Sequence, residues 1–341
     1  MRYRLLAALV LAVIALWSAA WFYLAGRAQD RFIAWLASVD AAGLNTRHGA
    51  LGVSGYPYRL VLAIDGLSIN QPGGWAWQSG PLRVVSQPWN ADHLVLLFDS
   101  PQTVTPAPGA PSVRLDARRA RASLVNNGRE ERLVLDLEDL TLQADGGAPL
   151  AAGRLQIFVR HAFDGAPAQE TPAETVPEGA GPHLADVAIK AQAVHVPAAK
   201  PTKLGEVIDS FGAQAAVYGQ LPTLDGAGLS RWSKQGGGME VSDFRLKWGP
   251  LTISGSGPFT LDQHGRPFAA FMAVISGHEA MIDALATTGM IDQPRANIAR
   301  MMLGTLAKEG GNKPLEVGVN MAEGFLFVGP VPLADLKPLI P

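Results

Sequence analysis

The stretch VRLDARRARASLVNNGREERLVLDLEDLTLQ, residues 113–143, decides the predicted fold of this chain. Apolar and polar residues alternate in it with the period of a half-buried β-strand, over 113–117, 120–125, 132–137 and 140–143. Asn126-Asn127-Gly128 lies between the second and third runs and is typical of a hairpin turn. The stretch therefore predicts antiparallel strands joined by a tight turn.

Alternating runs with the same period recur on both sides of this stretch. They follow one another at intervals of about ten residues, which is typical of an antiparallel meander and not of alternating β-α units. The predicted strands lie at 60–69 with a turn or bulge at 65–66, and at 75–77, 82–85, 92–98, 155–160, 187–194, 238–249, 251–257, 259–262, 267–275, 315–320 and 325–329. The fold class is therefore predicted to be mainly β.

Two stretches show helical periodicity instead. Apolar residues three and four apart predict one helix near 204–219. The second stretch, 278–308, is divided by Gly289 and Pro294 and predicts two helices with a short break. Between the two β regions, the segment 164–182 is rich in Pro, Ala, Glu and Gly without periodicity and predicts a flexible loop.

The N-terminus carries an unbroken run of 21 uncharged, mostly apolar residues, 5–25, preceded by Arg2 and Arg4. A helix rises about 1.5 Å per residue, so this run can cross a bilayer core about 30 Å thick. The arginines favour a cytoplasmic N-terminus, which predicts a single-pass anchor with the rest of the chain on the other side of the membrane. The alternative is a signal peptide cleaved near Ser18-Ala19-Ala20, although apolar sequence continues beyond that site.

Helical spacing continues past this run. Phe32, Trp35, Leu36 and Val39 recur at that spacing, and Gly43 is a stop signal. This extension is expected either to lie on the membrane or to pack on the following domain. The predicted architecture is mainly β with α, in which a transmembrane helix precedes an elongated antiparallel β groove partly covered by two or three helices. The predicted divisions are 1–43 (anchor and extension), 44–163 (first β region), 164–182 (loop) and 183–341 (second β region).

Composition limits the classes of function. The formal net charge is -2, which does not favour a nucleic-acid surface. The chain has no cysteine, which excludes disulfides, cysteine nucleophiles and thiolate metal sites. Hydrophobic residues make up 48% of the chain and charged residues 17%, below the usual ~25%. The excess of apolar residues is expected to fill a core or to line an apolar surface.

Several Gly-, Pro- and aromatic-containing motifs carry a family resemblance. They are Gly55-Tyr-Pro-Tyr-Arg-Leu, Asp65-Gly-Leu, Trp77-Gln, Val241-Ser-Asp-Phe-Arg-Leu-Lys-Trp-Gly-Pro-Leu, Gly255-Ser-Gly, Asp262-Gln-His-Gly-Arg-Pro and Gly324-Phe-Leu-Phe-Val-Gly-Pro-Val-Pro-Leu. Together they resemble an uncharacterised bacterial envelope family, the domain of unknown function numbered twenty-one twenty-five. The resemblance implies a membrane-tethered periplasmic β protein and no known activity. A looser likeness, to AsmA-like proteins, implies a grooved sheet that carries lipid.

The sequence offers no catalytic, metal or cofactor site. The histidines lack metal-ligand spacing, Gly255-Ser-Gly is not a nucleophile elbow, and Asp92-His93 and Asp262 with His264 look like turn or surface residues. Aromatic residues outside the anchor are the candidates for lining a lipid groove, although ordinary core packing would also explain them: Tyr56, Tyr58, Trp75, Trp77, Trp89, Phe98, Trp232 and Trp248.

Three hypotheses about function follow. The first is a membrane-anchored periplasmic protein with a β groove that binds phospholipid or another acyl-chain ligand, without catalysis. The second is a structural or adaptor protein of the envelope that binds a protein partner through a sheet edge or the 164–182 loop. The third, an unrecognised enzyme, has the least support, because no nucleophile, metal cluster or cofactor loop is recognisable.

Overall fold

The computed structural model describes residues 2–162, 181–196, 201–220, 226–309 and 314–339. Most of the segment predicted as a flexible loop lies outside the described residues. The chain divides into two compact units. The N-terminal unit comprises Met1–Asn127 and Leu133–Pro149, and the C-terminal unit comprises Gly128–Arg132 and Leu150–Pro341.

The described residues form four helices and 19 strands. The helices are α1 (Arg2–Ala41), α2 (Gly226–Lys234), α3 (His278–Thr288) and α4 (Gln293–Glu309). The strands begin with β1 (Asn45–His48), β2 (Leu51–Ser54), β3 (Leu60–Ile64), β4 (Leu67–Asn70), β5 (Ala76–Ser79), β6 (Leu82–Gln87), β7 (Asn90–Phe98), β8 (Gln102–Thr105), β9 (Val113–Asn126) and β10 (Glu130–Ala144). They continue with β11 (Leu150–Ala162), β12 (His183–His195), β13 (Val207–Tyr218), β14 (Gly238–Trp248), β15 (Leu251–Leu261), β16 (Pro267–Ser276), β17 (Leu315–Ala322), β18 (Phe325–Val328) and β19 (Val331–Asp335).

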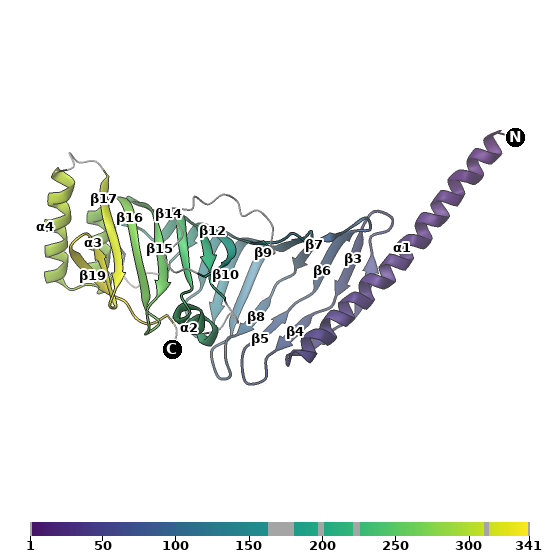
Figure 1. Cartoon of the computed structure of the whole chain (residues 1–341), viewed down its shortest axis with the longest axis horizontal. Helices are drawn as coiled ribbons and strands as arrows, with labels where there is room; N and C mark the ends of the chain where they lie inside the picture. The colour runs from purple at the N-terminus through teal and green to yellow at the C-terminus, as the bar shows by residue number, and fades with distance from the viewer. Residues whose placement is uncertain (1, 163–180, 197–200, 221–225, 310–313, 340–341) are drawn as a thin grey trace. The chain divides into compact units, whose positions relative to one another are not determined.

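Strands of the N-terminal unit form two antiparallel rows. One row runs β1–β4–β5–β8 and the other runs β2–β3–β6–β7, and β9 pairs with the last strand of each. Figure 1 shows β3, β6 and β7 above β4, β5 and β8. The chain passes from one row to the other at 49–50, 65–66, 80–81 and 99–101. We call this line of breaks the crease.

Backbone hydrogen bonds hold neighbouring strands together at the crease. The Gly49 amide donates to the Gly66 carbonyl at 3.0 Å, and the Asp65 amide donates to the Ala50 carbonyl at 3.0 Å. A Cβ on Gly49 would lie 1.9 Å from the Asp65 carbonyl oxygen, so only glycine fits there. The two rows of strands meet at this close backbone contact.

The core of the N-terminal unit joins both rows to the C-terminal half of α1. Leu62, Ile64, Leu67 and Leu82 from the strands are buried together with Leu36 of the helix. Phe32 packs on the same cluster. The helical extension therefore packs on the N-terminal unit, which is one of the two alternatives that the sequence left open.

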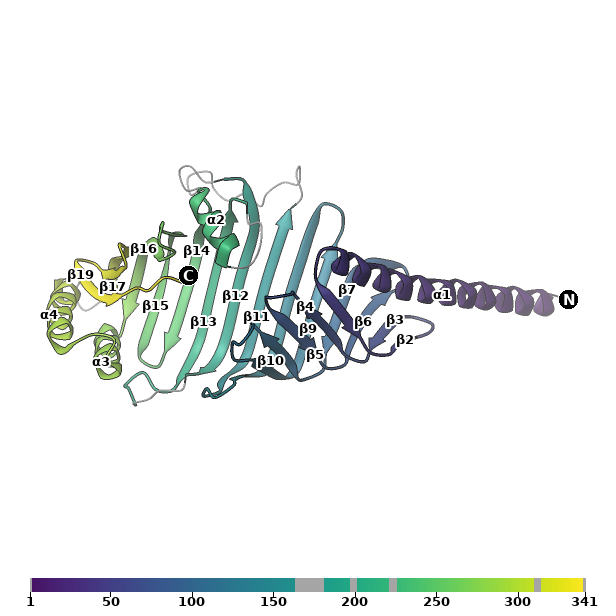
Figure 2. The same cartoon turned by 90° about the horizontal axis from the view of Figure 1, so that it is seen from below.

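The C-terminal unit is a meander of nine consecutive antiparallel strands, β11 to β19. Helices α3 and α4 connect β16 to β17 and pack on the sheet, as Figure 2 shows. Ile282, Ala296, Ala299 and Leu303 of these helices are fully buried against Ile275 and other sheet residues. These two helices supply the cover that one face of the sheet requires.

The fold class is confirmed: the chain is mainly antiparallel β with a long apolar N-terminal helix and helices that cover part of the sheet. The two helices predicted at 278–308 are also confirmed, with Gly289 ending α3 in a left-handed conformation. Several short elements were not predicted: β1, β2, β8, β19 and α2. Each is short enough to carry little periodicity of its own.

The helix predicted near 204–219 is wrong, because residues 207–218 form the strand β13. This strand pairs with β12 on one side and β14 on the other. Its apolar residues lie at even positions such as Ile208 and at odd positions such as Phe211 and Ala215, that is on both faces of the strand, so their spacing imitates that of a helix. Two long neighbouring strands satisfy its backbone groups, and this tertiary pairing outweighs the local pattern.

Candidate ligand-binding site

An apolar cavity of about 740 Å³ lies in the C-terminal unit. Its walls are one face of the strands β13 to β19, helix α3, and the segment that precedes β13. The strand residues that line it include Val241, Phe244, Leu246, Trp248, Ile253 and Phe271. Met281, Leu285 and Met290 close it from the helical side. Its volume falls within the range of about 300–1,000 Å³ found for small-molecule pockets.

The alternation of each strand explains why apolar side chains gather on this face. On β15, Leu251 and Ile253 face the cavity while Thr252 between them is exposed. On β14 the cavity-facing positions change from odd to even between Val241 and Phe244, where the pairing with β15 shifts register. This bulge keeps the apolar residues of the whole strand on one face.

Few polar side chains reach the cavity. Thr202 and Thr288 carry hydroxyl groups among its lining residues, and the Trp248 indole Nε1 donates to the Gly205 carbonyl at 3.0 Å. No acidic, basic or histidine side chain belongs to the described lining. Such a surface favours alkyl groups, because transfer of apolar area out of water is the dominant source of binding energy there.

A charged cluster lies beside the cavity wall. Asp283 of α3 accepts a hydrogen bond from Lys203 Nζ at 2.8 Å and two from the Arg300 guanidinium of α4, at 3.0 and 3.2 Å. Lys203 is adjacent in sequence to the cavity-lining residue Leu204, and Asp283 is adjacent to the cavity-lining residue Ala284. The hydrogen bonds from Lys203 and Arg300 lower the pKa of Asp283 below its usual value. This cluster ties the segment before β13 to both helices.

We expect Asp283→Asn to destabilise the C-terminal unit by about 1 kcal/mol at pH 7, the scale of a partly exposed charged hydrogen-bond cluster. Because folding lowers the carboxyl pKa, its stabilisation is present above the unfolded pKa of about 3.9 and is lost as the pH falls through the folded pKa. Urea unfolding of both proteins between pH 7 and 2.5 measures this. The difference should vanish on acidification, whereas Glu316→Gln, at an exposed carboxylate on β17, should show little difference at any pH. A difference between wild type and Asp283→Asn that is constant with pH would contradict the assignment.

The structure distributes the eight predicted groove residues among different surroundings. Trp248 lines the cavity. Trp232 belongs to α2 and is buried, and its Nε1 donates to the Tyr218 carbonyl at 2.7 Å. Trp77 and Phe98 pack on the core of the N-terminal unit with their ring centroids 6.5 Å apart.

The remaining four predicted residues are exposed in the N-terminal unit. Trp75 lies in the turn between β4 and β5, and Tyr56, Tyr58 and Trp89 lie in turns beside α1. The sequence analysis did not single out the other cavity residues, such as Val241. The available signal was the apolar residue at every second position of the C-terminal strands, which marks one face of the sheet. Whether any of these residues contacts lipid stays a prediction.

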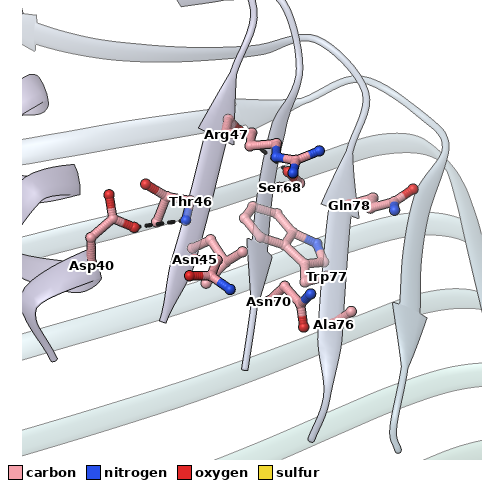
Figure 3. A pocket seen from close by; sticks show the side chains of 10 residues that line it. Asp40, Asn45, Thr46, Arg47, Ser68, Asn70, Ala76, Trp77 and Gln78 are labelled. Carbon is pink, nitrogen blue, oxygen red and sulfur yellow. Dashed lines mark hydrogen bonds between the residues drawn. The ribbon is translucent and has the colours of Figure 1, made fainter. Parts of the chain in front are cut away.

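The N-terminal unit has a recess of a different character, with a volume of about 510 Å³. Figure 3 shows the Trp77 indole surrounded by the polar side chains of Asn45, Asn70 and Arg47. Asp40 at the end of α1 accepts a hydrogen bond from the Thr46 amide at 2.7 Å, which closes one side of the recess. Because its lining is polar, this recess does not share the chemistry of the cavity.

The two Asp–His pairs that the sequence drew attention to, Asp262 with His264 and Asp92 with His93, make different contacts. Asp262 accepts hydrogen bonds from the His264 and Arg266 amides and pairs with the Arg266 guanidinium, so it organises a turn. His93 Nε2 lies 2.9 Å from the hydroxyl oxygen of Ser123. Among the described residues there is no group of three or more His, Cys, Asp or Glu side chains that could hold a metal ion.

A sequence model of the family described as an uncharacterized protein conserved in bacteria (DUF2125) matches residues 21–337. The chain belongs to this family. No curated protein and no solved structure matches the DUF2125 chain. Its helix α1 is long and apolar enough to cross a membrane, a property that anchors share with signal sequences.

Proposed function

We propose that this DUF2125 protein is an inner-membrane-anchored periplasmic protein that holds an acyl chain of a phospholipid in the cavity of its C-terminal unit, without catalysis. The observation that carries the proposal is the cavity of about 740 Å³ with its almost wholly apolar lining. Each methylene group that moves from water into such a site contributes about 0.8 kcal/mol. A segment of about sixteen methylenes therefore supplies roughly 13 kcal/mol, which covers the roughly 8 kcal/mol of micromolar binding and an association cost of about 4 kcal/mol.

The charged cluster beside the cavity favours a phospholipid over a neutral lipid. Lys203 is exposed, and Arg300 is partly exposed, whereas one carboxylate, Asp283, lies between them. The cluster offers two cationic hydrogen-bond donors, and the carboxylate of Glu279 also acts on Lys203. A phosphate group at the end of a bound acyl chain would gain charge-assisted hydrogen bonds from either cation.

The anchor is proposed from α1 and the two arginines that precede its apolar run. Contacts made by residues that cleavage would remove favour an anchor over a cleaved signal. Trp17 Nε1 donates to the Pro57 carbonyl at 3.1 Å, and the Ser18 hydroxyl lies 2.8 Å from the Tyr56 hydroxyl. Cleavage after Ala20 would remove both interactions.

Photocrosslinking tests the cavity directly. The full chain is reconstituted in nanodiscs that contain a phospholipid with a diazirine at the end of one acyl chain, irradiated, and digested for mass spectrometry. We expect crosslinked peptides from β14, β15 and β16 in addition to those from α1. The Val241→Asp substitution places a carboxylate in the cavity and should reduce crosslinking to these strands by about tenfold, because the charge must lose water when an acyl chain enters.

Ser242→Asp is the matched control, because Ser242 is exposed on the same strand one residue further along. It adds the same charge without entering the cavity and should leave the yield unchanged. Crosslinks confined to α1, or equal yields in the strands of the wild type and Val241→Asp, would contradict acyl-chain binding in the cavity.

The second candidate function is that of an envelope adaptor. It is favoured by an apolar stripe on the opposite face of β16, where Phe268, Met272 and Val274 are 49%, 67% and 39% exposed. Exposed apolar stripes of this kind mark surfaces that bind partners. A cavity free of lipid crosslinks would shift the assignment toward this function.

A further inference from the structure

Exposed aromatic side chains gather where two turns of the N-terminal unit meet α1. The turn between β2 and β3 presents Tyr56 and Tyr58, which are 47% and 71% exposed, and the turn between β6 and β7 presents Trp89, which is 61% exposed. Trp17 and Phe22 of α1 lie beside them, 37% and 66% exposed. We call these five residues the aromatic collar.

Specific contacts join the helix to the turns. The Trp17 and Trp89 ring centroids are 6.2 Å apart, and Phe22 stacks on Tyr56 at the same distance. Trp21 Nε1 donates to the Arg59 carbonyl at 3.0 Å. Trp21 itself is 4% exposed, because it is buried with Ala25 and Leu60. The helix is therefore held firmly to both turns and is not a loose tether.

The level of the collar along the helix is the decisive observation. Trp17 to Phe22 lie inside the apolar run 5–25, and the rise of a helix places Trp17 about 12 Å before the end of that run. The turns therefore reach the last part of the segment that would cross the bilayer. Figure 1 shows α1 continuing toward the N-terminus well beyond the strands of this unit.

Tyrosine and tryptophan rings favour this depth in a bilayer. Their apolar bodies and polar tips suit the membrane–water interface, where both residues are enriched. Arg59 is exposed in the same turn as Tyr58 and adds a cation suited to lipid phosphates. The aromatic surface is also continuous with the exposed apolar surface of α1, whose residues Leu9 and Ile14 are 62% and 51% exposed.

We propose that the turns at 55–59 and 87–90 insert their aromatic side chains into the interface of the bilayer that α1 crosses, on its periplasmic side. The inference rests on the anchor of the proposed function and goes beyond it, because it fixes how the N-terminal unit sits on the membrane. The partner is the headgroup and upper acyl region of a phospholipid leaflet. The N-terminal unit is then a membrane-seated body and not a domain on a flexible stalk.

Nitroxide labelling tests this placement, because the chain has no native cysteine. Single substitutions Tyr58→Cys and Trp89→Cys are made in the full chain, labelled, and reconstituted in vesicles of phosphatidylcholine and phosphatidylglycerol. Electron paramagnetic resonance then measures collisions with oxygen, which concentrates in lipid, and with a nickel chelate, which stays in water. We expect both labels to lose nickel collisions and gain oxygen collisions relative to Trp75→Cys.

Trp75→Cys is the matched control, because Trp75 is an exposed tryptophan in a turn of the same unit. It precedes β5, in the row of strands whose first member, β1, is bonded through Thr46 to Asp40 at the C-terminal end of α1. A fourth label, Leu9→Cys, reports on the anchor alone. If Leu9 is in lipid while positions 58 and 89 match position 75, the inference is overturned and the anchor stands. If the Leu9 label is also in water, the anchor itself fails.

Discussion

Replacing Leu303 with alanine is expected to lower the free energy of unfolding of the C-terminal unit by about 3 kcal/mol. The Leu303 side chain is 0% exposed, and so are Ile282, Ala296 and Ala299 in the same cluster. Because these neighbours are themselves fully buried, the side chains around the site cannot move in to fill the void that the mutation creates. The loss therefore includes both the transfer energy of the removed carbons and the cost of an unfilled void.

Hydrogen exchange followed by mass spectrometry measures this loss within the C-terminal unit, in peptides from α4 and β16. Met301→Ala on the same helix is the control, because Met301 is 66% exposed. It should change stability by less than about 0.5 kcal/mol. Equal losses of protection in the two variants would show that α4 is not packed as described.

Replacing Gly49 with alanine is expected to destabilise the N-terminal unit by about 3 kcal/mol, the upper part of the range for forced overpacking. The added Cβ would lie 1.9 Å from the Asp65 carbonyl oxygen, which is a backbone atom. The Asp65 carbonyl cannot move away from the added Cβ without breaking the backbone hydrogen bonds that Gly49 and Asp65 make at the crease. The strand pairs β1–β4 and β2–β3 meet there, so both should lose protection.

Gly52→Ala supplies the control three residues away. A Cβ on Gly52 would meet no atom within 4 Å, and the residue is exposed on β2. This substitution should be neutral or slightly stabilising, because it restricts the unfolded chain. Hydrogen exchange of peptides from β1 to β4 compares the two variants. A Gly49→Ala protein as stable as Gly52→Ala would mean that the two rows do not meet as closely as described.

Local periodicity was sufficient to predict most strands of this chain and two of its helices. Alternation over 113–125 and 132–143 reflects burial of one face of each strand. The alternation is the same whichever helix or strand packs on that face, so it can be recognised from the sequence. The break between α3 and α4 was also readable, since Gly289 adopts the left-handed conformation that glycine favours. The long apolar run of α1 is likewise a property of composition alone.

Tertiary structure decided what local pattern could not. Residues 207–218 form a strand because β12 and β14 pair with them on both sides, despite helical spacing of their apolar residues. Trp248 faces the cavity and Trp77 packs in a core, although both are tryptophans in predicted strands. Periodicity shows that a strand has an apolar face, but only long-range packing decides whether that face meets a helix, another strand or an open cavity.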